Sequence, residues 1–190
     1  MRNCSMKKIF IKGTRKYNLR HNKERLKSPE SGKMINGQGL GLVAKFRYGI
    51  CPMSFNGCEV IAVHNALVYM KKPRPLFEIA FYMERFRMLF GFFGCNPFGI
   101  GKALRHFGIN STRSHSTEDA KAFIMTFWTK RPFLSEIHTV FCVRTAHGIA
   151  VYNRYNNCPD VRYCRTAEEL TGKRKPITVY IIERYNEISL

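Results

Sequence analysis

Cys58 is the residue of this chain best placed for nucleophilic chemistry. It follows Gly57 and opens an apolar, alanine-containing pattern of helical period that continues to Met70. Unpaired backbone N–H groups and the macrodipole favour negative charge at a helix N-terminus, and so lower the pKa of a thiol there. Gly57 lets the backbone turn sharply, and the N–H of Cys58 could donate to an oxyanion. These features predict a nucleophilic thiol at Cys58.

A thiol nucleophile needs a base, and His138, at the start of a predicted strand, is the favoured one. If residues 144–147 form a tight hairpin turn, His138 lies directly opposite Asn153 on the next strand. Directly opposed residues share a face, with Cβ atoms about 4.5–5.5 Å apart. The Asn153 amide would then hold the imidazole tautomer, as the third group of a triad does. Asp160 is the reserve for this orienting role.

Each of these residues also has a structural interpretation. A lone cysteine such as Cys58 is more often a small buried apolar residue than a nucleophile, and His138 could cap a strand edge. His64 lies on the same predicted helix as Cys58 but projects from another side of it. The order of a helix-start cysteine, a strand-start histidine and a hairpin asparagine favours the catalytic interpretation. The remaining histidines have no companions that indicate chemistry: His21, His106, His115 and His147.

The elements that position these side chains are helices first and strands second. Helical spacing of apolar residues predicts four helices, at residues 59–70, 76–90, 97–107 and 117–128. Asn96 and Pro97 form a cap and first-turn proline for the third of them. A two-residue period then predicts strands at 138–143, 149–155 and 177–185, with a short helix at 166–170. Helices followed by an antiparallel sheet are typical of an α+β domain.

The charge of the chain is strongly positive and unevenly distributed. The 190 residues carry a net charge of +19, and residues 1–35 contribute 11 Lys/Arg against 2 Asp/Glu. We expect residues 1–35 to be a basic flexible tail without regular structure, and residues 36–190 to be the domain. The glycine-rich segment 37–41 does not complete a phosphate-binding pattern and is expected to be a turn. Such a charge favours anionic partners.

The sequence predicts a cytoplasmic protein that uses no cofactor and no metal. Lys7 and Lys8 are followed by only three apolar residues, far short of a signal-peptide core, and no run is long enough for an integral membrane segment. The seven cysteines are scattered, odd in number and expected to be reduced. Cys51/Cys58 and Cys158/Cys164 lack the close spacing of structural zinc sites.

The segment from Asn56 to Val60, followed by His138 and then Asn153, resembles the bacterial papain-like cysteine peptidases related to the bacteriocin-leader peptidases. The resemblance covers roughly residues 45–185. It implies a papain-like fold, in which an N-terminal helical lobe packs on a C-terminal antiparallel sheet. It also implies a Cys58–His138–Asn153 triad that cleaves a peptide or amide bond through a thioacyl-enzyme.

One position departs from the pattern of this family, whose members usually carry a Gln several residues before the cysteine as an oxyanion donor. Here residues 50–55 contain no Gln, which leaves Asn56 or Ser54 as the candidate donor. Loss of one such donor typically costs about 100- to 1000-fold in rate.

The alternative function is therefore a catalytically inactive papain-like module that binds nucleic acid or another polyanion through its basic surface. The basic tail and aromatic residues such as Tyr152 and Tyr155 suggest this. A third hypothesis is a peripheral contact of the tail with anionic lipid. The sequence indicates neither the substrate, the scissile bond, the role of the tail nor the oligomeric state.

Overall fold

A six-stranded antiparallel sheet packed against a group of helices makes up an α+β fold. The computed structural model describes residues 15–25, 32–129, 136–172 and 174–183. The strand order is β3-β8-β4-β5-β6-β7. The strands are β3 (Ser111–Ser114), β4 (Ala122–Thr129), β5 (Glu136–Thr145), β6 (Gly148–Tyr152), β7 (Arg162–Cys164) and β8 (Thr178–Ile182). A separate two-stranded sheet pairs β1 (Arg47–Tyr48) with β2 (Cys51–Pro52).

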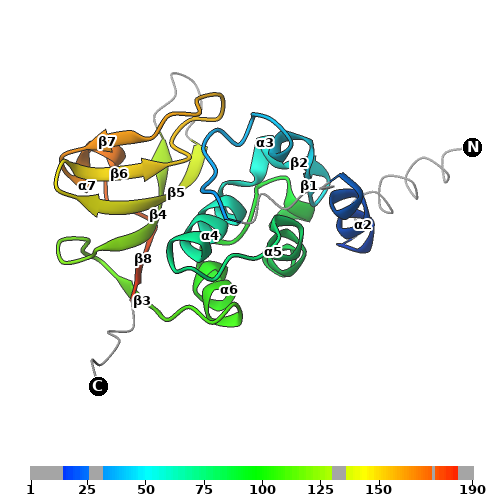
Figure 1. Cartoon of the computed structure of the whole chain (residues 1–190), viewed down its shortest axis with the longest axis horizontal. Helices are drawn as coiled ribbons and strands as arrows, with labels where there is room; N and C mark the ends of the chain where they lie inside the picture. The colour runs from blue at the N-terminus through cyan, green and yellow to red at the C-terminus, as the bar shows by residue number, and fades with distance from the viewer. Residues whose placement is uncertain (1–14, 26–31, 130–135, 173, 184–190) are drawn as a thin grey trace, which may run out of the picture.

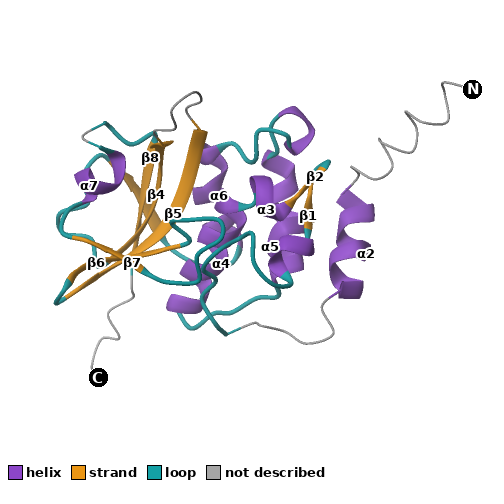
Figure 2. Cartoon of the chain, turned by 90° about the horizontal axis from the view of Figure 1, so that it is seen from above, coloured by secondary structure: helices purple, strands orange, loops and turns teal. Residues whose placement is uncertain are grey.

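The described helices lie on both faces of the large sheet. They are α2 (Arg15–Arg25), α3 (Met53–Asn56), α4 (Cys58–Tyr69), α5 (Leu76–Met83), α6 (Ile100–His106) and α7 (Ala167–Thr171). Four short 3-10 turns accompany them, at Val43–Lys45, Glu84–Phe86, Leu89–Gly91 and Pro97–Gly99. Figures 1 and 2 show α4, α5 and α6 on one side of the sheet, α7 on the other, and α2 on the far side of the helical group.

The sheet has a hydrophobic core on each face. On one face, Ile124 and Phe141 join a cluster with the buried residues of α4, α5 and α6. On the other face, Phe127 and Val140 join a cluster with Leu170 of α7. Successive side chains of a strand point to opposite faces. Alternate residues of a strand therefore pack into different cores.

Two of the four predicted helices agree closely with the structure. The helix predicted at 59–70 is α4, and it begins at Cys58. The helix predicted at 97–107 is α6 with its preceding 3-10 turn, and the Asn96 side chain accepts a hydrogen bond from the Phe98 N–H at 3.0 Å. The helix predicted at 76–90 ends early, at Met83, because the chain turns into 3-10 segments there.

The prediction of a helix at residues 117–128 is wrong, since this segment contains most of strand β4. Its residues Ala122–Phe127 are buried on both faces of the sheet, so the strand shows no two-residue alternation of apolar and polar side chains. Its run of β-branched and aromatic residues suits a central strand. Among the strands, 138–143, 149–155 and the described part of 177–185 correspond to β5, β6 and β8, and the short helix at 166–170 to α7.

The predicted tail lies partly outside the described residues, at 1–14 and 26–31, but the expectation of no regular structure is wrong for Arg15–Arg25. These residues form α2, which packs on α5. The helix has almost no apolar face, so hydrophobic periodicity could not reveal it. Residue 35 is likewise part of the fold, because the Ile35 backbone exchanges hydrogen bonds with the buried Asn65 side chain at 2.7 and 3.0 Å.

Candidate functional site around Cys58

Cys58 is the first residue of α4 and lies where the helical group meets the sheet. Its side chain is 7% exposed. The preceding residue must be glycine, because a Cβ at Gly57 would lie 2.0 Å from Met53 Cγ and 2.6 Å from the Met53 carbonyl oxygen. This close approach turns the chain from α3 directly into α4 and sets the sulfur at the helix start.

The Cys58 sulfur has a carboxyl group as its hydrogen-bond partner. Cys58 Sγ lies 3.3 Å from Glu59 Oε2, and Thr139 of β5 contacts the sulfur from the sheet. Burial raises the pKa of the Cys58 thiol well above its ordinary value, and the Glu59 carboxylate raises it further. The contacts with Thr139 act in the opposite direction but do not offset burial. The helix N-terminus therefore does not by itself make this sulfur a thiolate.

Glu59 is a buried acid whose pKa lies near neutrality. Burial raises the pKa of its carboxyl group to about 7, against smaller opposing effects of its own backbone N–H, the Cys58 thiol and the Cys95 backbone. A Cβ on Gly94 would lie 3.3 Å from Glu59 Oε2, so the chain passes close to the carboxyl group. An acid with such a pKa exchanges protons readily at neutral pH.

His138 belongs to the other face of the sheet. Thr139, its neighbour in β5, is the residue that meets Cys58, and it also bonds the Thr126 hydroxyl at 2.9 Å. The His138 ring instead meets the edge of Phe127, with ring centroids 6.3 Å apart and planes at 88°. Phe127 belongs to the core on the α7 side. Because neighbouring side chains of β5 point to opposite faces, the imidazole lies on the face away from Cys58.

The structure brings His138 and Asn153 together, but through the backbone of Asn153. His138 Nε2 lies 2.7 Å from the Asn153 carbonyl oxygen. A carbonyl oxygen only accepts, so Nε2 carries the proton of the neutral ring and Nδ1 the lone pair. The predicted turn at 144–147 is displaced: Thr145 pairs with Gly148 and Phe141 with Tyr152, a register two residues from the expected one. Asn153 then follows the end of β6, with φ of +61°.

The Asn153 amide group is bound to Gln38 instead. Asn153 Nδ2 donates to Gln38 Oε1 at 2.9 Å, and the Gln38 backbone N–H donates to Asn153 Oδ1 at 3.0 Å. Gln38 Nε2 also donates to the Ser54 carbonyl at 3.1 Å, one turn before Cys58. The three predicted triad side chains therefore do not form one hydrogen-bonded chain. Cys58 contacts Glu59 and Thr139, and His138 contacts the Asn153 backbone. The Asn153 side chain binds Gln38, which in turn binds the turn before Cys58.

Of the two candidate oxyanion donors, Asn56 has its side-chain N–H group bound to backbone carbonyls. Asn56 is buried and its Nδ2 donates to the Tyr48 carbonyl at 2.9 Å and to the Gly91 carbonyl. Ser54 contributes its carbonyl oxygen, which accepts from Gln38 and from Asn156. The Oδ2 atom of the reserve residue Asp160 lies 3.7 Å from the thiol sulfur of Cys158.

Sequence reasoning missed Glu59, Thr139 and Gln38. Glu59 had a visible signal, because it is an acid directly beside the candidate nucleophile in an otherwise apolar helix start. Gln38 lay in the glycine-rich segment interpreted as a turn, and its contact with Asn153 spans 115 residues. Thr139 carried no signal beyond its place after His138.

Within the described residues, no group of three or more His, Cys, Asp or Glu side chains is arranged to hold a metal ion. No helix in the same residues has both the length and the apolar character that crossing a bilayer requires. The six cysteines in this part of the chain have free thiols. Comparison of the chain with protein-family models, with curated proteins and with solved structures finds no match.

Proposed function

We propose that this chain is a papain-like thiol hydrolase that cleaves a peptide or related amide bond at Cys58. The observation that carries the proposal is the 3.3 Å contact between Cys58 Sγ and Glu59 Oε2 at the start of α4. It joins a nucleophile to a base whose pKa is about 7, which satisfies both the geometric and the pKa requirement for general base catalysis.

In the proposed reaction, Cys58 Sγ attacks the carbonyl carbon of the amide while its proton passes to Glu59. The C–N bond breaks as the amine leaves with the proton that Glu59 returns, which produces a thioester on Cys58. Water then attacks the thioester, the acid is released, and the thiol is restored. Glu59 takes the role of the base because it is the ionisable group in hydrogen-bond contact with the sulfur.

His138 is the competing base, since the resemblance to papain-like peptidases assigns it this role. Its Nε2 is bound to the Asn153 carbonyl oxygen, and the ring lies on the opposite face of β5 from Cys58. We therefore give His138 a positioning role, in which Nε2 holds the start of the 153–156 loop. His138→Ala should lower turnover less than Glu59→Gln does.

The test combines thiol labelling with turnover. The folded protein is treated with iodoacetamide or a peptidyl vinyl sulfone near neutral pH, and each cysteine is quantified by mass spectrometry. Base assistance predicts that Cys58 reacts ahead of the half-buried Cys51 and Cys158, and ahead of the fully buried Cys142. Turnover of a panel of fluorogenic peptide amides should disappear in Cys58→Ala and persist in Cys142→Ala.

The second candidate function is a non-catalytic module with the same scaffold. It is favoured by the burial of Cys58, which raises the thiol pKa, and by Thr139 in the place where a papain-like enzyme needs an imidazole. Labelling of Cys51 and Cys158 while Cys58 stays unmodified, together with no turnover, would overturn the hydrolase proposal and leave this candidate.

A further inference from the structure

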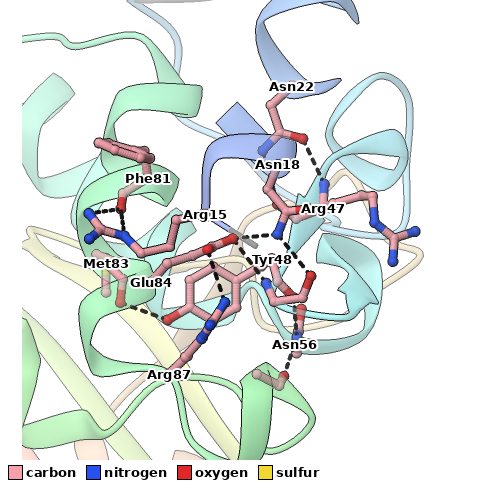
Figure 3. A network of polar contacts seen from close by, with 12 residues as sticks. Arg15, Asn18, Asn22, Arg47, Tyr48, Asn56, Phe81, Met83, Glu84 and Arg87 are labelled. Atoms are coloured by element: carbon pink, nitrogen blue, oxygen red, sulfur yellow. Dashed lines mark hydrogen bonds and ion pairs between the residues drawn. The ribbon is translucent and has the colours of Figure 1, made fainter. Parts of the chain in front are cut away.

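Helix α2 is a strongly polar helix that buried polar contacts hold against the domain. Asn18 is 2% exposed, and its Nδ2 donates to Glu84 Oε1 at 2.5 Å and to the Gly49 carbonyl at 2.8 Å. Glu84 Oε1 also accepts from the Gly49 N–H at 3.1 Å. Figure 3 shows this network between α2, the end of α5 and the turn after Tyr48.

Two further contacts fix the orientation of α2. Asn22 pairs with the Arg47 backbone, accepting from its N–H at 2.8 Å and donating to its carbonyl at 2.9 Å. The Arg15 guanidinium donates to the Phe81 carbonyl at 3.1 and 3.3 Å (Figure 3). A helix with so little apolar surface gains little from hydrophobic burial. Its polar anchoring therefore holds the exposed sides of α2 in a fixed position.

One exposed side of α2, next to the anchored face, is cationic. Lys16, Arg20 and Lys23 are exposed and follow one another at positions i, i+4 and i+7, so they form a single stripe. The stripe spans about 10 Å along the helix axis, which is the rise of about three stacked nucleotides in one strand.

A groove with aromatic walls lies beside this stripe, between α2 and α5. Its volume is about 380 Å³, and its apolar lining includes Leu19, Phe77, Phe81 and Phe107. Lys23 and Arg85 are its cationic lining residues, and Glu78 is its acidic one. The groove thus combines flat apolar rings with positive charge at one edge.

The groove contains an aromatic stack whose outer ring, that of the exposed His106, a nucleobase can extend. Tyr82 and His106, which both line it, stack with ring centroids 3.8 Å apart and planes at 7°. The Arg85 guanidinium lies over the Tyr82 ring at 4.8 Å, and the Arg15 guanidinium lies over the Phe81 ring at 4.4 Å. Aromatic rings that bind bases, beside cations that bind phosphates, form the usual site for single-stranded nucleic acid.

We infer that the α2–α5 groove binds single-stranded nucleic acid, with a base stacked on the exposed ring of His106 and the phosphates along Lys16, Arg20 and Lys23. The inference does not depend on the chemistry of Cys58. An acidic peptide would use the same cations, but it lacks the flat rings that the groove would stack.

The binding test uses the full chain and a fluorescein-labelled oligothymidine of about 12 nucleotides, followed by fluorescence anisotropy. Three phosphate contacts predict that affinity falls roughly 20-fold when salt rises from about 50 to about 200 mM. The triple variant Lys16→Gln/Arg20→Gln/Lys23→Gln should lose most of this salt dependence. The matched control Lys121→Gln/Arg162→Gln/Lys175→Gln removes the same charge from exposed positions on the sheet side and should keep it.

The aromatic part of the site has its own variants. His106→Ala should weaken binding roughly 5- to 150-fold, the effect of one lost base stack, and His106→Phe should restore it. Glu78→Gln should strengthen binding because it removes the acidic group of the groove. Cys58→Ala should bind like the unmodified chain, which separates this site from the proposed hydrolase.

Three results would overturn the assignment. One is no binding at about 50 mM salt. Another is an equal loss in both triple variants, which would indicate a diffuse effect of the net charge. The third is competition by poly-glutamate as effective as by unlabelled oligothymidine, which would assign the groove to acidic polypeptides.

Discussion

Cys58 and Glu59 form a pair in which the carboxylate opposes ionisation of the thiol, while the hydrogen bond from the thiol favours ionisation of the carboxyl group. Both are buried, and burial is the first cause of the raised pKa of each. The carboxylate then raises the thiol pKa further, because two negative charges would lie within one hydrogen bond. The pair therefore holds at most one negative charge at neutral pH, and that charge resides on Glu59.

Glu59→Gln should separate the electrostatic role of Glu59 from its role as a base. At a fixed alkaline pH, hydroxide rather than Glu59 removes the thiol proton, and loss of the carboxylate lowers the Cys58 thiol pKa, so we expect faster alkylation of Cys58 by iodoacetamide under that condition. Amide turnover should fall by about 10²- to 10⁴-fold, because the general base is lost. The two rates are measured on the same preparation, with Cys142→Ala as the control. Changes of both rates in the same direction would contradict the proposed roles.

Glu59 should also make stability depend on pH. Its pKa is about 7 in the folded protein and 4.5 as an ordinary carboxyl group, so folding favours the protonated form. The stabilising contribution is complete below pH 4.5 and is lost as pH rises through 7. The loss amounts to about 3 kcal/mol at 1.36 kcal/mol per pKa unit.

Thermal unfolding at pH 5 and pH 8 measures this effect. Glu59→Gln should show a smaller difference between the two melting temperatures than the unmodified chain does. Part of the difference should remain, because burial raises the pKa of Glu84 as well. An unchanged pH dependence in Glu59→Gln would show that Glu59 ionises normally.

Among the elements, the turn after β1 joins the helix α2, the end of α5 and the segment before α6. Gly49 has φ of +59°, and its backbone bonds Asn18 and Glu84. Its neighbour Ile50 donates its N–H to the Phe90 carbonyl at 3.0 Å. The position is crowded, since a Cβ on Gly49 would lie 2.1 Å from the Phe90 carbonyl oxygen. Only glycine fits here for both reasons.

Gly49→Ala should therefore destabilise the protein more than Gly41→Ala. Both residues have a positive φ, at +59° and +58°, but a Cβ on Gly41 meets nothing within 4 Å. The backbone term of about 1–2 kcal/mol is common to both, and the clash at Gly49 adds about 1–3 kcal/mol. Urea unfolding of the two variants measures the difference. Equal losses would show that the Phe90 segment moves aside without cost.

At the scale of the whole molecule, charge is the property that sets behaviour in solution. A net charge of +19 on 190 residues implies self-repulsion in the folded state. Among the described residues the sole salt bridge joins Arg87 to Glu84, at 3.3 Å. Positive charges thus greatly outnumber the acids available to neutralise them, and dissolved anions must provide much of the screening.

Stability should consequently increase with salt. Raising NaCl from about 20 to about 200 mM shortens the screening length severalfold, so the melting temperature should rise by a few degrees. The triple variant Lys16→Gln/Arg20→Gln/Lys23→Gln should have a higher melting temperature at low salt and a smaller salt response. A melting temperature that falls with NaCl would mean that attractive ion pairs outweigh the repulsion.

The accuracy of the sequence predictions followed the strength of the local signal. The helix start at Cys58 and the Asn96 cap were predictable, because glycine, proline and capping residues act over a few residues. β4 was not, since a central strand buried on both faces has lost the alternation that distinguishes a strand from a helix. α2 was not predictable either, because its partners Gly49 and Glu84 lie 31 and 66 residues from Asn18.

The sequence by itself determined an α+β chain of strong positive charge, with a cysteine behind glycine at a helix start. It also placed His138 at the beginning of a strand that pairs with the strand before Asn153. Only the tertiary structure decided that Thr139, and not His138, meets the Cys58 sulfur. The reason is that neighbouring strand residues point to opposite faces, so a difference of one residue exchanges an imidazole for a hydroxyl.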